Sequence, residues 1–495
     1  MNKAHCNRCH ELVPATPLNR DGRIHLVKEC PSCGTTETLI SGDADRYLAK
    51  RALDSGYDYQ TCGLNCLECK HGPHPTFVFI DVTNRCNLNC PICINNTPGM
   101  GFTFEPPFEY FDKIFQHFAK DDPPPAVQLF GGEPTMRPDL FDIIRKARSY
   151  GFPTRVVTNG LKLADEGYCR ELVATKATIL IAYDGGNPET YRTLRASPKS
   201  LDLKLKALEN IRRIGGAKVA LMTCVSKGFN DQEMPALMEF CHDRRDYIRG
   251  VYFMPLAQTW DTAKFALEPE RTTNEDIEAA VAAAFPGERV EFVPAGCLGD
   301  IPTVMKYLHA KPPPFRGAHP NCESMYLLVS DGERYRPLSW YLKDSIHDLV
   351  RDLTALEARL AGPGFKGPWL PLRARLAAYR TVARHVRLSR LLKGRGAGKI
   401  GHAAGALAGL LLRRKTRRIL EAHTTVQDSL QLIVLPFEDQ HVLETDRMER
   451  CPNAFAFYDP VEERVRTVPV CAWGKHKKAV LRKVADYYVK TAAQA

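Results

Sequence analysis

The sequence lacks any long apolar stretch. No run approaches the roughly 20 apolar residues that a membrane-spanning helix needs. The first residues, Met-Asn-Lys-Ala-His-Cys, also lack the apolar core of a secretory signal. These absences predict a cytoplasmic protein, in which cysteines persist as thiols and serve as metal ligands more often than as disulfides.

Acidic residues are fewer than basic ones, with 57 Asp and Glu against 68 Lys and Arg and a formal net charge of +11. This balance favours an anionic partner such as a nucleic acid, a lipid headgroup or a phosphorylated substrate. A basic surface that serves only solubility would give the same balance, so charge alone does not choose among these partners.

Cysteine, by contrast, is abundant. The chain has 17 cysteines, and ten of them fall within the first 93 residues. Cys6 and Cys9 form one pair, and Cys30 and Cys33 form a second pair about 20 residues later. This spacing predicts a tetrahedral four-thiolate site of zinc-ribbon or rubredoxin type, which would hold one Fe or Zn ion.

Two further groups share the spacing Cys-x3-Cys-x2-Cys. The first is Cys62, Cys66 and Cys69, and the second is Cys86, Cys90 and Cys93. Only the second group directly follows an apolar, β-branched run, which predicts a buried strand before it. Three thiolates at these spacings can hold three irons of a [4Fe–4S] cluster and leave the fourth iron open. A structural zinc knuckle or an ordinary ferredoxin site is the alternative.

Strand-like and helix-like segments alternate from residue 76 onward. The predicted strands are Thr76–Val82, Ala126–Phe130, Thr154–Thr158, Ile179–Tyr183, Val219–Val225 and Val251–Met254. Helix-like segments between them include Pro138–Ser149, Ser200–Ile214 and Gln232–Cys241. This alternation predicts βαβ units and a parallel sheet. Six units indicate an α/β fold with an open, partial (β/α)6 barrel.

Three motifs follow the ends of these strands, where barrel active sites lie: Gly131-Gly132-Glu133-Pro134 after the second, Asn159-Gly160 after the third and Asp184-Gly185 after the fourth. With the Cys86 group, their order resembles the radical SAM superfamily. The resemblance implies a [4Fe–4S] cluster whose open iron binds S-adenosylmethionine (SAM), which is cleaved to a 5′-deoxyadenosyl radical. It also implies cluster ligands at Cys86, Cys90 and Cys93, and it places SAM contacts at Gly131, Gly132, Glu133, Pro134, Asn159 and Asp184.

The whole layout is similar to one branch of that superfamily, which includes archaeal tetraether lipid synthase and class D radical SAM methylases. This resemblance implies a rubredoxin-like N-terminal domain, one SAM-cleaving cluster and two auxiliary [4Fe–4S] clusters. The expected domains are 1–40 (metal knuckle), 41–75 (auxiliary cysteines), 76–290 (barrel), 291–345 (auxiliary-cluster segment), 346–425 (basic helical segment) and 426–495 (C-terminal auxiliary-cluster domain).

The auxiliary ligands remain open at the level of sequence. The Cys62 group lacks a preceding strand, so we expect it to hold an auxiliary cluster, with a zinc clip as the alternative. Four thiols of the C-terminal third can complete a second cluster, supply a fourth ligand to the first, or pack separately: Cys297, Cys322, Cys451 and Cys471. Cys169, Cys224 and Cys241 lie within expected helices or strands and are interpreted as packing residues.

Residues 371–420 carry 14 Lys and Arg and no Asp or Glu. Within them, Ala403–Leu412 is a short apolar run followed by a basic cluster. This pattern favours an interfacial helix at an anionic membrane surface, although a basic hairpin packed on the barrel would look similar. A nucleic acid is disfavoured, because most of the segment has no aromatic residue for base stacking.

Together these features predict a transferase-type radical SAM enzyme that functionalises an unactivated C–H bond of a lipid acyl chain, by C–C coupling or by methylation. The expected electron donor is a small redox protein. The first alternative is a radical SAM methylase of a pterin or another small molecule. The second is a non-catalytic iron–sulfur electron carrier, which the Gly131–Pro134 segment disfavours because a carrier needs no SAM pocket.

Overall fold

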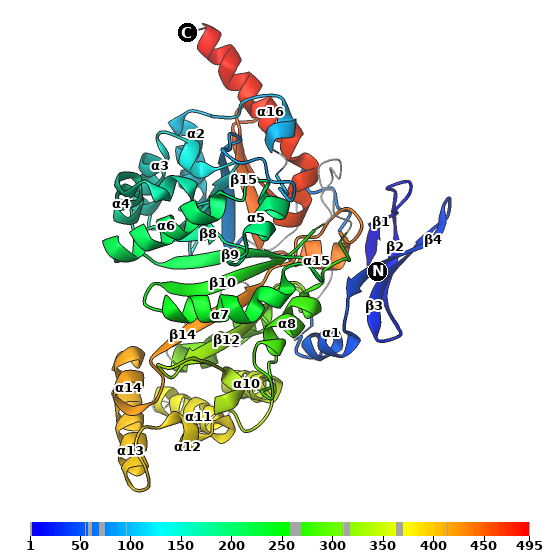
Figure 1. Cartoon of the computed structure of the whole chain (residues 1–495). Helices are drawn as coiled ribbons and strands as arrows, with labels where there is room; N and C mark the ends of the chain where they lie inside the picture. Colours follow the sequence, from blue (N-terminus) through cyan, green and yellow to red (C-terminus); the bar gives the residue numbers. More distant parts are fainter. Residues whose placement is uncertain are drawn as a thin grey trace.

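The computed structural model describes residues 2–54, 56–57, 62–68, 75–95, 97–257, 269–308, 310, 317–362, 370–412 and 414–494. In these residues the chain forms a small antiparallel N-terminal sheet and a large mixed sheet flanked by helices (Figure 1).

Six parallel strands form the centre of the large sheet. They are adjacent in chain order: β5 (Phe77–Thr83), β6 (Ala126–Gly131), β7 (Thr154–Thr158), β8 (Thr178–Ala182), β9 (Val219–Val225) and β10 (Ile248–Pro255). Every residue of β9 is buried, as expected for a parallel strand covered on both faces. The predicted partial barrel is therefore confirmed.

The helices that cover the sheet lie between these strands, except for α8, which follows the last strand: α2 (Phe108–Phe118), α3 (Leu140–Ser149), α4 (Glu166–Ala174), α5 (Pro188–Arg195), α6 (Ser200–Ile214), α7 (Met234–Asp243) and α8 (Asn274–Ala283). Apolar residues at three- and four-residue spacing face the strands. In α6, for example, Leu201, Leu208 and Ile211 are buried, whereas Leu203 and Leu205 are exposed.

Later segments of the chain extend the barrel sheet at both edges. On one side, β14 (Asp428–Val434) pairs parallel with β10, followed by β12 (Ser324–Ser330), which also pairs with β11 (Val293–Pro294) and β13 (Tyr335–Pro337). On the other side, β15 (Asn453–Asp459) pairs parallel with β5 and antiparallel with β16 (Arg464–Pro469). The boundary expected at residue 426 thus precedes three strands of the barrel sheet, β14, β15 and β16.

The C-terminal helix α16 (Val470–Gln494) is fixed to β5. Trp473 Nε1 donates a hydrogen bond of 2.8 Å to Asp81 Oδ2, and Lys477 Nζ donates one of 2.9 Å to Asp81 Oδ1. All three side chains are buried, so the Asp81–Lys477 ion pair is shielded from water. This contact lies within three residues of the loop that carries Cys86, Cys90 and Cys93.

The N-terminal sheet has the order β1 (Lys3–His5), β2 (Leu12–Arg20), β3 (Arg23–Cys30) and β4 (Gly34–Ser41). It contacts the barrel near α15 (Thr445–Glu449), where Asn2 Nδ2 donates to Glu444 at 2.7 Å and Lys28 Nζ donates to the His441 carbonyl at 2.6 Å. Helix α1 (Ala44–Arg51) follows, and its buried Lys50 bridges Glu275 and Glu278 of α8 at 2.7 and 2.6 Å.

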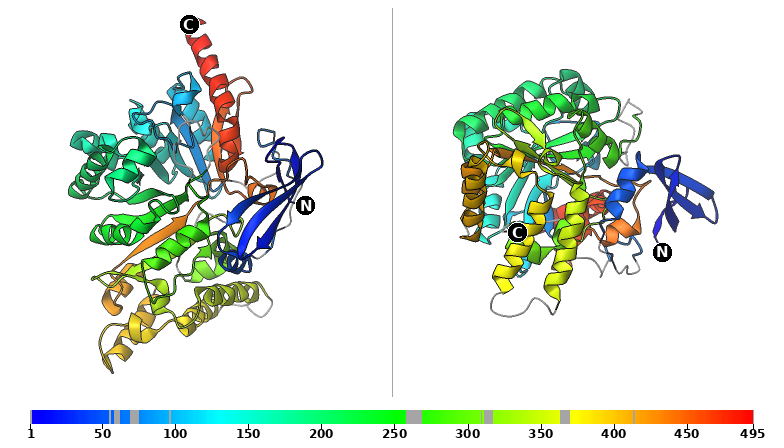
Figure 2. Two further views of the ribbon diagram at one scale, coloured as in Figure 1. Left: turned by 45° about the vertical axis from the view of Figure 1, so that its right-hand side comes forward. Right: turned by 90° about the horizontal axis from the view of Figure 1, so that it is seen from below.

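The basic segment is helical, as expected. It contains α11 (Leu370–His385), α12 (Leu388–Leu391), α13 (Gly398–Leu411) and α14 (Thr416–His423), after α9 (Pro302–Tyr307) and α10 (Ile346–Ala361). Figures 1 and 2 place α13 and α14 as a hairpin at the end of the molecule opposite the tip of α16. In the described part of the chain, no helix is both long and apolar enough to cross a membrane.

Candidate active site

A cavity of roughly 200 Å³ lies inside the barrel and extends from the first residues of β5 and β7 to the C-terminal ends of the central strands. The loop after β5 brings Cys86, Cys90 and Cys93 to its wall, and the loop after β6 brings Gly131, Gly132 and Glu133. The three thiols do not converge within 4.8 Å, as they would for a single ion. Wider spacing fits ligands that each hold a different iron of a [4Fe–4S] cluster.

The two glycines let the β5 and β6 loops touch backbone to backbone. Gly132 N donates to the Thr83 carbonyl at 2.7 Å, and Glu133 N donates to the Arg85 carbonyl at 2.8 Å. A Cβ atom would lie 2.3 Å from the Thr83 oxygen at Gly131 and 2.3 Å from the Arg85 oxygen at Gly132. Because the obstacle is backbone, only glycine fits, and the approach holds the cysteine loop in place.

The buried Glu133 side chain links the C-terminal ends of β6 and β7. Its Oε1 accepts from Thr158 Oγ1 at 2.6 Å, and its Oε2 accepts from Asn159 N at 2.6 Å. Asn159 Nδ2 in turn donates to Asn87 Oδ1, within the cysteine loop, at 2.7 Å. Glu133 and Asn159 both line the cavity, whereas Pro134 is buried beside it.

Asp184 lies behind the cavity wall. Arg195 Nε and one terminal nitrogen donate to its two oxygens at 2.7 and 2.8 Å, and Cys224 N donates at 2.9 Å. Burial alone would raise the pKa of Asp184, but the Arg195 charge and hydrogen bonds hold it below its usual value. Asp184 does not line the cavity itself. It holds Arg195, which lines the cavity.

Arg195 and Lys204 are site residues that sequence reasoning missed. Lys204 is fully buried, and its Nζ donates to the carbonyls of Asn159 and Ala182 at 2.5 and 2.6 Å. Burial and the nearby Arg195 charge lower the pKa of Lys204 to about 8. The sequence did contain a signal for Lys204. It lies in the apolar stripe of its helix with Leu201 and Leu208, where a buried cation needs hydrogen-bond partners.

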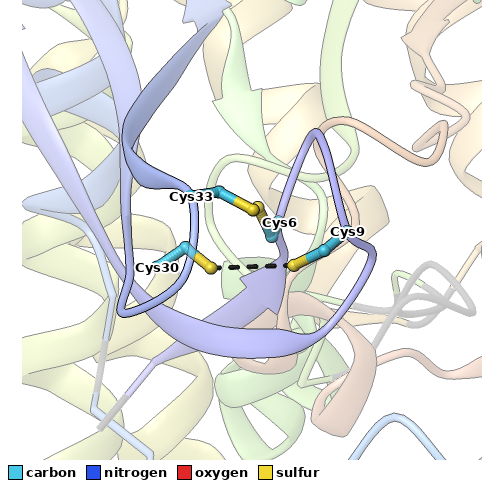
Figure 3. Close-up of side chains that lie close together, drawn as sticks. All are labelled: Cys6, Cys9, Cys30 and Cys33. Carbon is cyan, nitrogen blue, oxygen red and sulfur yellow. Dashed lines mark hydrogen bonds between the residues drawn. The ribbon is translucent and has the colours of Figure 1, made fainter.

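The N-terminal cysteines converge as predicted. The Sγ atoms of Cys6, Cys9, Cys30 and Cys33 all lie within 4.8 Å of one another, and those of Cys9 and Cys30 are 3.6 Å apart (Figure 3). Metal–sulfur bonds of about 2.3 Å at tetrahedral angles require sulfur separations close to this. Backbone N–H groups of Cys9 and Arg8 lower the pKa of Cys6 to about 6, which favours the metal-binding thiolate.

Replacing Cys9 and Cys33 with Ser should lower the metal content by one equivalent, because two of four ligands are lost. Elemental analysis of the anaerobically purified protein measures this. Substitution is preferable to deleting residues 1–40, which would also remove the contacts of Asn2 and Lys28 with the barrel. Cys169→Ala, at a buried core thiol, is the control. An unchanged metal count would exclude the site.

The remaining cysteines fall into separate groups. Cys62 and Cys66 are buried in the main core beside β16, where Arg466 donates to the Leu67 carbonyl, and Cys69 lies outside the described residues. In the C-terminal third, burial first and then neighbouring Glu charges raise the pKa values of three thiols that lie near one another, Cys322, Cys451 and Cys471. Nearby Cys charges add to this effect at Cys322 and Cys471.

Cys297 packs in a different apolar cluster, and its thiol donates to the Pro294 carbonyl at 2.9 Å. Cys169 and Cys241 are fully buried in the main core. Cys224, interpreted from sequence as a packing residue, packs against Ile92 and also lines the cavity.

Two family models match the chain, one over the barrel and one over the N-terminal sheet. The model described as Radical SAM superfamily matches residues 80–241, and the one described as HMPTM N-terminal zinc ribbon domain matches residues 2–42. A 7,8-dihydro-6-hydroxymethylpterin dimethyltransferase of Methanocaldococcus jannaschii is 32% identical over 352 residues, which cover 68% of this chain and 69% of that protein. A GTP 3′,8-cyclase of Nautilia profundicola is 30% identical over 36% of this chain and 56% of its own length.

Solved structures resemble the chain more distantly. Streptococcus suis SuiB bound to S-adenosylmethionine aligns with a TM-score of 0.36 and 17% identity over 42% of this chain and 47% of that one. A radical SAM methyltransferase from Sphaerobacter thermophilus aligns with a TM-score of 0.34 and 14% identity over 55% of this chain and 75% of that one.

From the cysteine loop, the Gly-Gly-Glu approach, the zinc ribbon and the relative from M. jannaschii, we conclude that this chain belongs to the radical SAM superfamily and is a radical SAM enzyme.

Proposed function

We propose that this enzyme methylates a carbon of a pterin or a similar planar heterocycle. The observation that carries this proposal is the lining of the cavity. Phe77, Phe79, Phe130 and Tyr252 supply aromatic surface, and Arg155 supplies a cation. The pterin dimethyltransferase from M. jannaschii, the relative that aligns over 352 residues, supports the same class of substrate.

Arg155 is held between two rings. Its Cζ lies 5.0 Å from the centroid of Phe77 and 4.9 Å from that of Tyr252. Its buried Nε has no hydrogen-bond partner among the described residues. A buried donor without an acceptor costs about 1–3 kcal/mol, which a ligand that supplies an acceptor recovers. The carbonyl and ring nitrogens of a pterin are such acceptors, and its flat ring suits the aromatic walls.

The cavity lining matches the lipid acyl chain expected from the sequence less well than it matches a heterocycle. An acyl chain offers Arg155 no acceptor, and no described residue of the basic segment 371–420 lines the cavity. The charge pattern that suggested a lipid substrate therefore belongs to a different part of the molecule. A small redox protein as electron donor and auxiliary clusters on the remaining cysteines stay predictions.

When bound, the cluster and SAM together supply an organic radical to the cavity. Cys86, Cys90 and Cys93 hold the cluster in this proposal. Gly131, Gly132, Glu133 and Asn159 contact SAM along the wall, and Pro134 shapes the turn behind them. Asp184 acts as a positioning residue, because it orients Arg195 toward the cavity.

Arg155→Met should raise the KM for the heterocycle at least about tenfold, since a lost charge-assisted hydrogen bond is worth about 1.5–3 kcal/mol. The assay combines the reconstituted enzyme, SAM, a reductant and 7,8-dihydro-6-hydroxymethylpterin, with mass analysis of the product. SAM cleavage without substrate should be unchanged in this variant. An unaltered KM, or methylation of an acyl lipid in place of the pterin, would contradict the proposal.

A further inference from the structure

Helix α13 presents its apolar side to solvent. Ile400 and Leu407 within the helix, and Leu412 directly after it, are 72%, 46% and 68% exposed, and Ala404 and Ala408 are also exposed. Positions 400, 404, 407 and 408 recur at three- and four-residue spacing, so they share one face of the helix. No charged residue interrupts the sequence from Ile400 to Leu412.

The opposite face of α13 consists of small residues packed on α14. A Cβ atom at Gly405 would lie 2.4 Å from His423 Cε1, and one at Gly409 would lie 3.0 Å from Ile419 Cγ1. Ile419 of α14 is buried in this contact. The hairpin thus places its small residues inside and large residues of α13 outside, the reverse of an ordinary solvent-facing helix.

Cations stand at both ends of the apolar face. Lys393 and Arg395 precede α13 and are exposed, and a second exposed group follows it: Arg414, Lys415, Arg417 and Arg418. Lys393 Nζ donates to the Glu421 carbonyl, and Arg417 pairs with the Glu421 carboxylate at 2.6 Å. No acidic residue lies between positions 371 and 420, so Glu421 supplies the one carboxylate that pairs with these cations in the described residues.

We propose that α13 is an interfacial helix that docks this enzyme on an anionic lipid bilayer. Its outward face lies among the upper parts of the acyl chains, and the flanking cations meet the lipid phosphates. With 14 residues, α13 is too short to span a bilayer and lies in the plane of its surface. This docking concerns where the enzyme works and is independent of the substrate in its cavity.

Other occupants fit this surface less well. A second copy packed face to face on α13 would bring identical basic clusters together, and like charges at an interface oppose association. A nucleic acid would satisfy the cations but not Ile400 and Leu407, and residues 388–423 contain no Phe, Trp or Tyr on which bases could stack.

The test is flotation of the full-length protein with vesicles of phosphatidylcholine and phosphatidylglycerol in equal parts, and with vesicles of phosphatidylcholine alone. The apolar variant is Ile400→Ser with Leu407→Ser. The charge variant is Arg414→Gln with Lys415→Gln and Arg418→Gln, which leaves the Arg417–Glu421 pair intact. The matched control is Val461→Ser with Val489→Ser, at side chains that are 61% and 68% exposed elsewhere on the protein.

The parent and the control should float with the anionic vesicles, and added salt should weaken this binding. The apolar variant should bind at least about tenfold less tightly, and the charge variant roughly 100-fold less tightly, at about fivefold per cation. All variants should keep SAM cleavage without substrate. Equal flotation of parent and variants would overturn the proposal. So would loss of a dimer in the apolar variant by sedimentation, which would assign the face to a second copy.

Discussion

Replacing Cys86, Cys90 and Cys93 together with Ala should reduce 5′-deoxyadenosine formation to the background without enzyme. The three thiols line the cavity beside the Gly-Gly-Glu segment, and no other cysteine loop in the described residues adjoins that segment. In the proposed site these thiols are the protein ligands of the cluster, so without them we expect that SAM cannot be reduced. Chromatographic measurement of 5′-deoxyadenosine after anaerobic reconstitution gives the result, and iron analysis should show the loss of one cluster.

The paired experiment separates this triad from the other one. Cys62→Ala with Cys66→Ala should also lower the iron content, yet leave measurable cleavage of SAM, because this segment lies against β16 and not on the cavity wall. Cys169→Ala, at a fully buried core thiol, controls for the effect of removing a cysteine. If the Cys62 and Cys66 variant alone abolished cleavage in a folded protein, the roles of the two triads would be reversed.

Gly132→Ala should lower SAM cleavage roughly 100-fold, the loss that a displacement of about 1 Å in a catalytic site can produce. The added Cβ would lie 2.3 Å from the Arg85 carbonyl oxygen, so the loop before Cys86 has to shift. The same shift would stretch the 2.8 Å hydrogen bond from Glu133 N. Cleavage rate, SAM affinity and the electron paramagnetic resonance signal of the reduced cluster report the displacement.

Gly186→Ala is the matched control for this substitution. It adds the same methyl group two residues after Asp184, but the new Cβ would meet nothing within 4 Å. Its cleavage rate and melting temperature should stay near those of the parent protein. A Gly132→Ala enzyme that cleaves SAM within twofold of the parent would show that the backbone contact between the β5 and β6 loops does not position the cluster.

The central strands could be predicted because a buried parallel strand is locally recognisable. Val219–Val225 is apolar almost throughout since both of its faces are covered, and its bounds match β9. The cluster and glycine motifs follow such strands directly in sequence, so their convergence on one cavity follows from the parallel arrangement. The four-thiolate knuckle was predictable for a similar reason, because its ligands come as two short pairs.

Features that depend on distant partners could not be predicted. Nothing in Asn453–Asp459 indicates that it pairs with β5, whose first residue, Phe77, lies opposite Asn453. The strand Leu12–Arg20 is concealed by Pro14 and Pro17, which lack the N–H that a strand normally donates. The role of Arg195 depends on Asp184 from another element, and burial of this pair is visible only in three dimensions.

The substrate class depends on the lining of the cavity, which composition does not locate. Fourteen cations and an apolar run are a property of residues 371–420, and composition alone assigns them to no site. In the structure, the basic segment and the cavity are separate places. Residues 371–420 form peripheral helices, whereas the cavity is lined by aromatic residues and Arg155. Surface chemistry and cavity chemistry then suggest a membrane for the one and a heterocycle for the other.

The Asp81–Lys477 contact joins two residues that are synthesised at widely separated times. Lys477 emerges from the ribosome 396 residues after Asp81. At 5–20 residues per second, β5 therefore waits roughly 20–80 s for the strand and helix that cover its edge. Until then, the buried Asp81 carboxylate beside the cysteine loop lacks both of its partners from α16, Trp473 and Lys477.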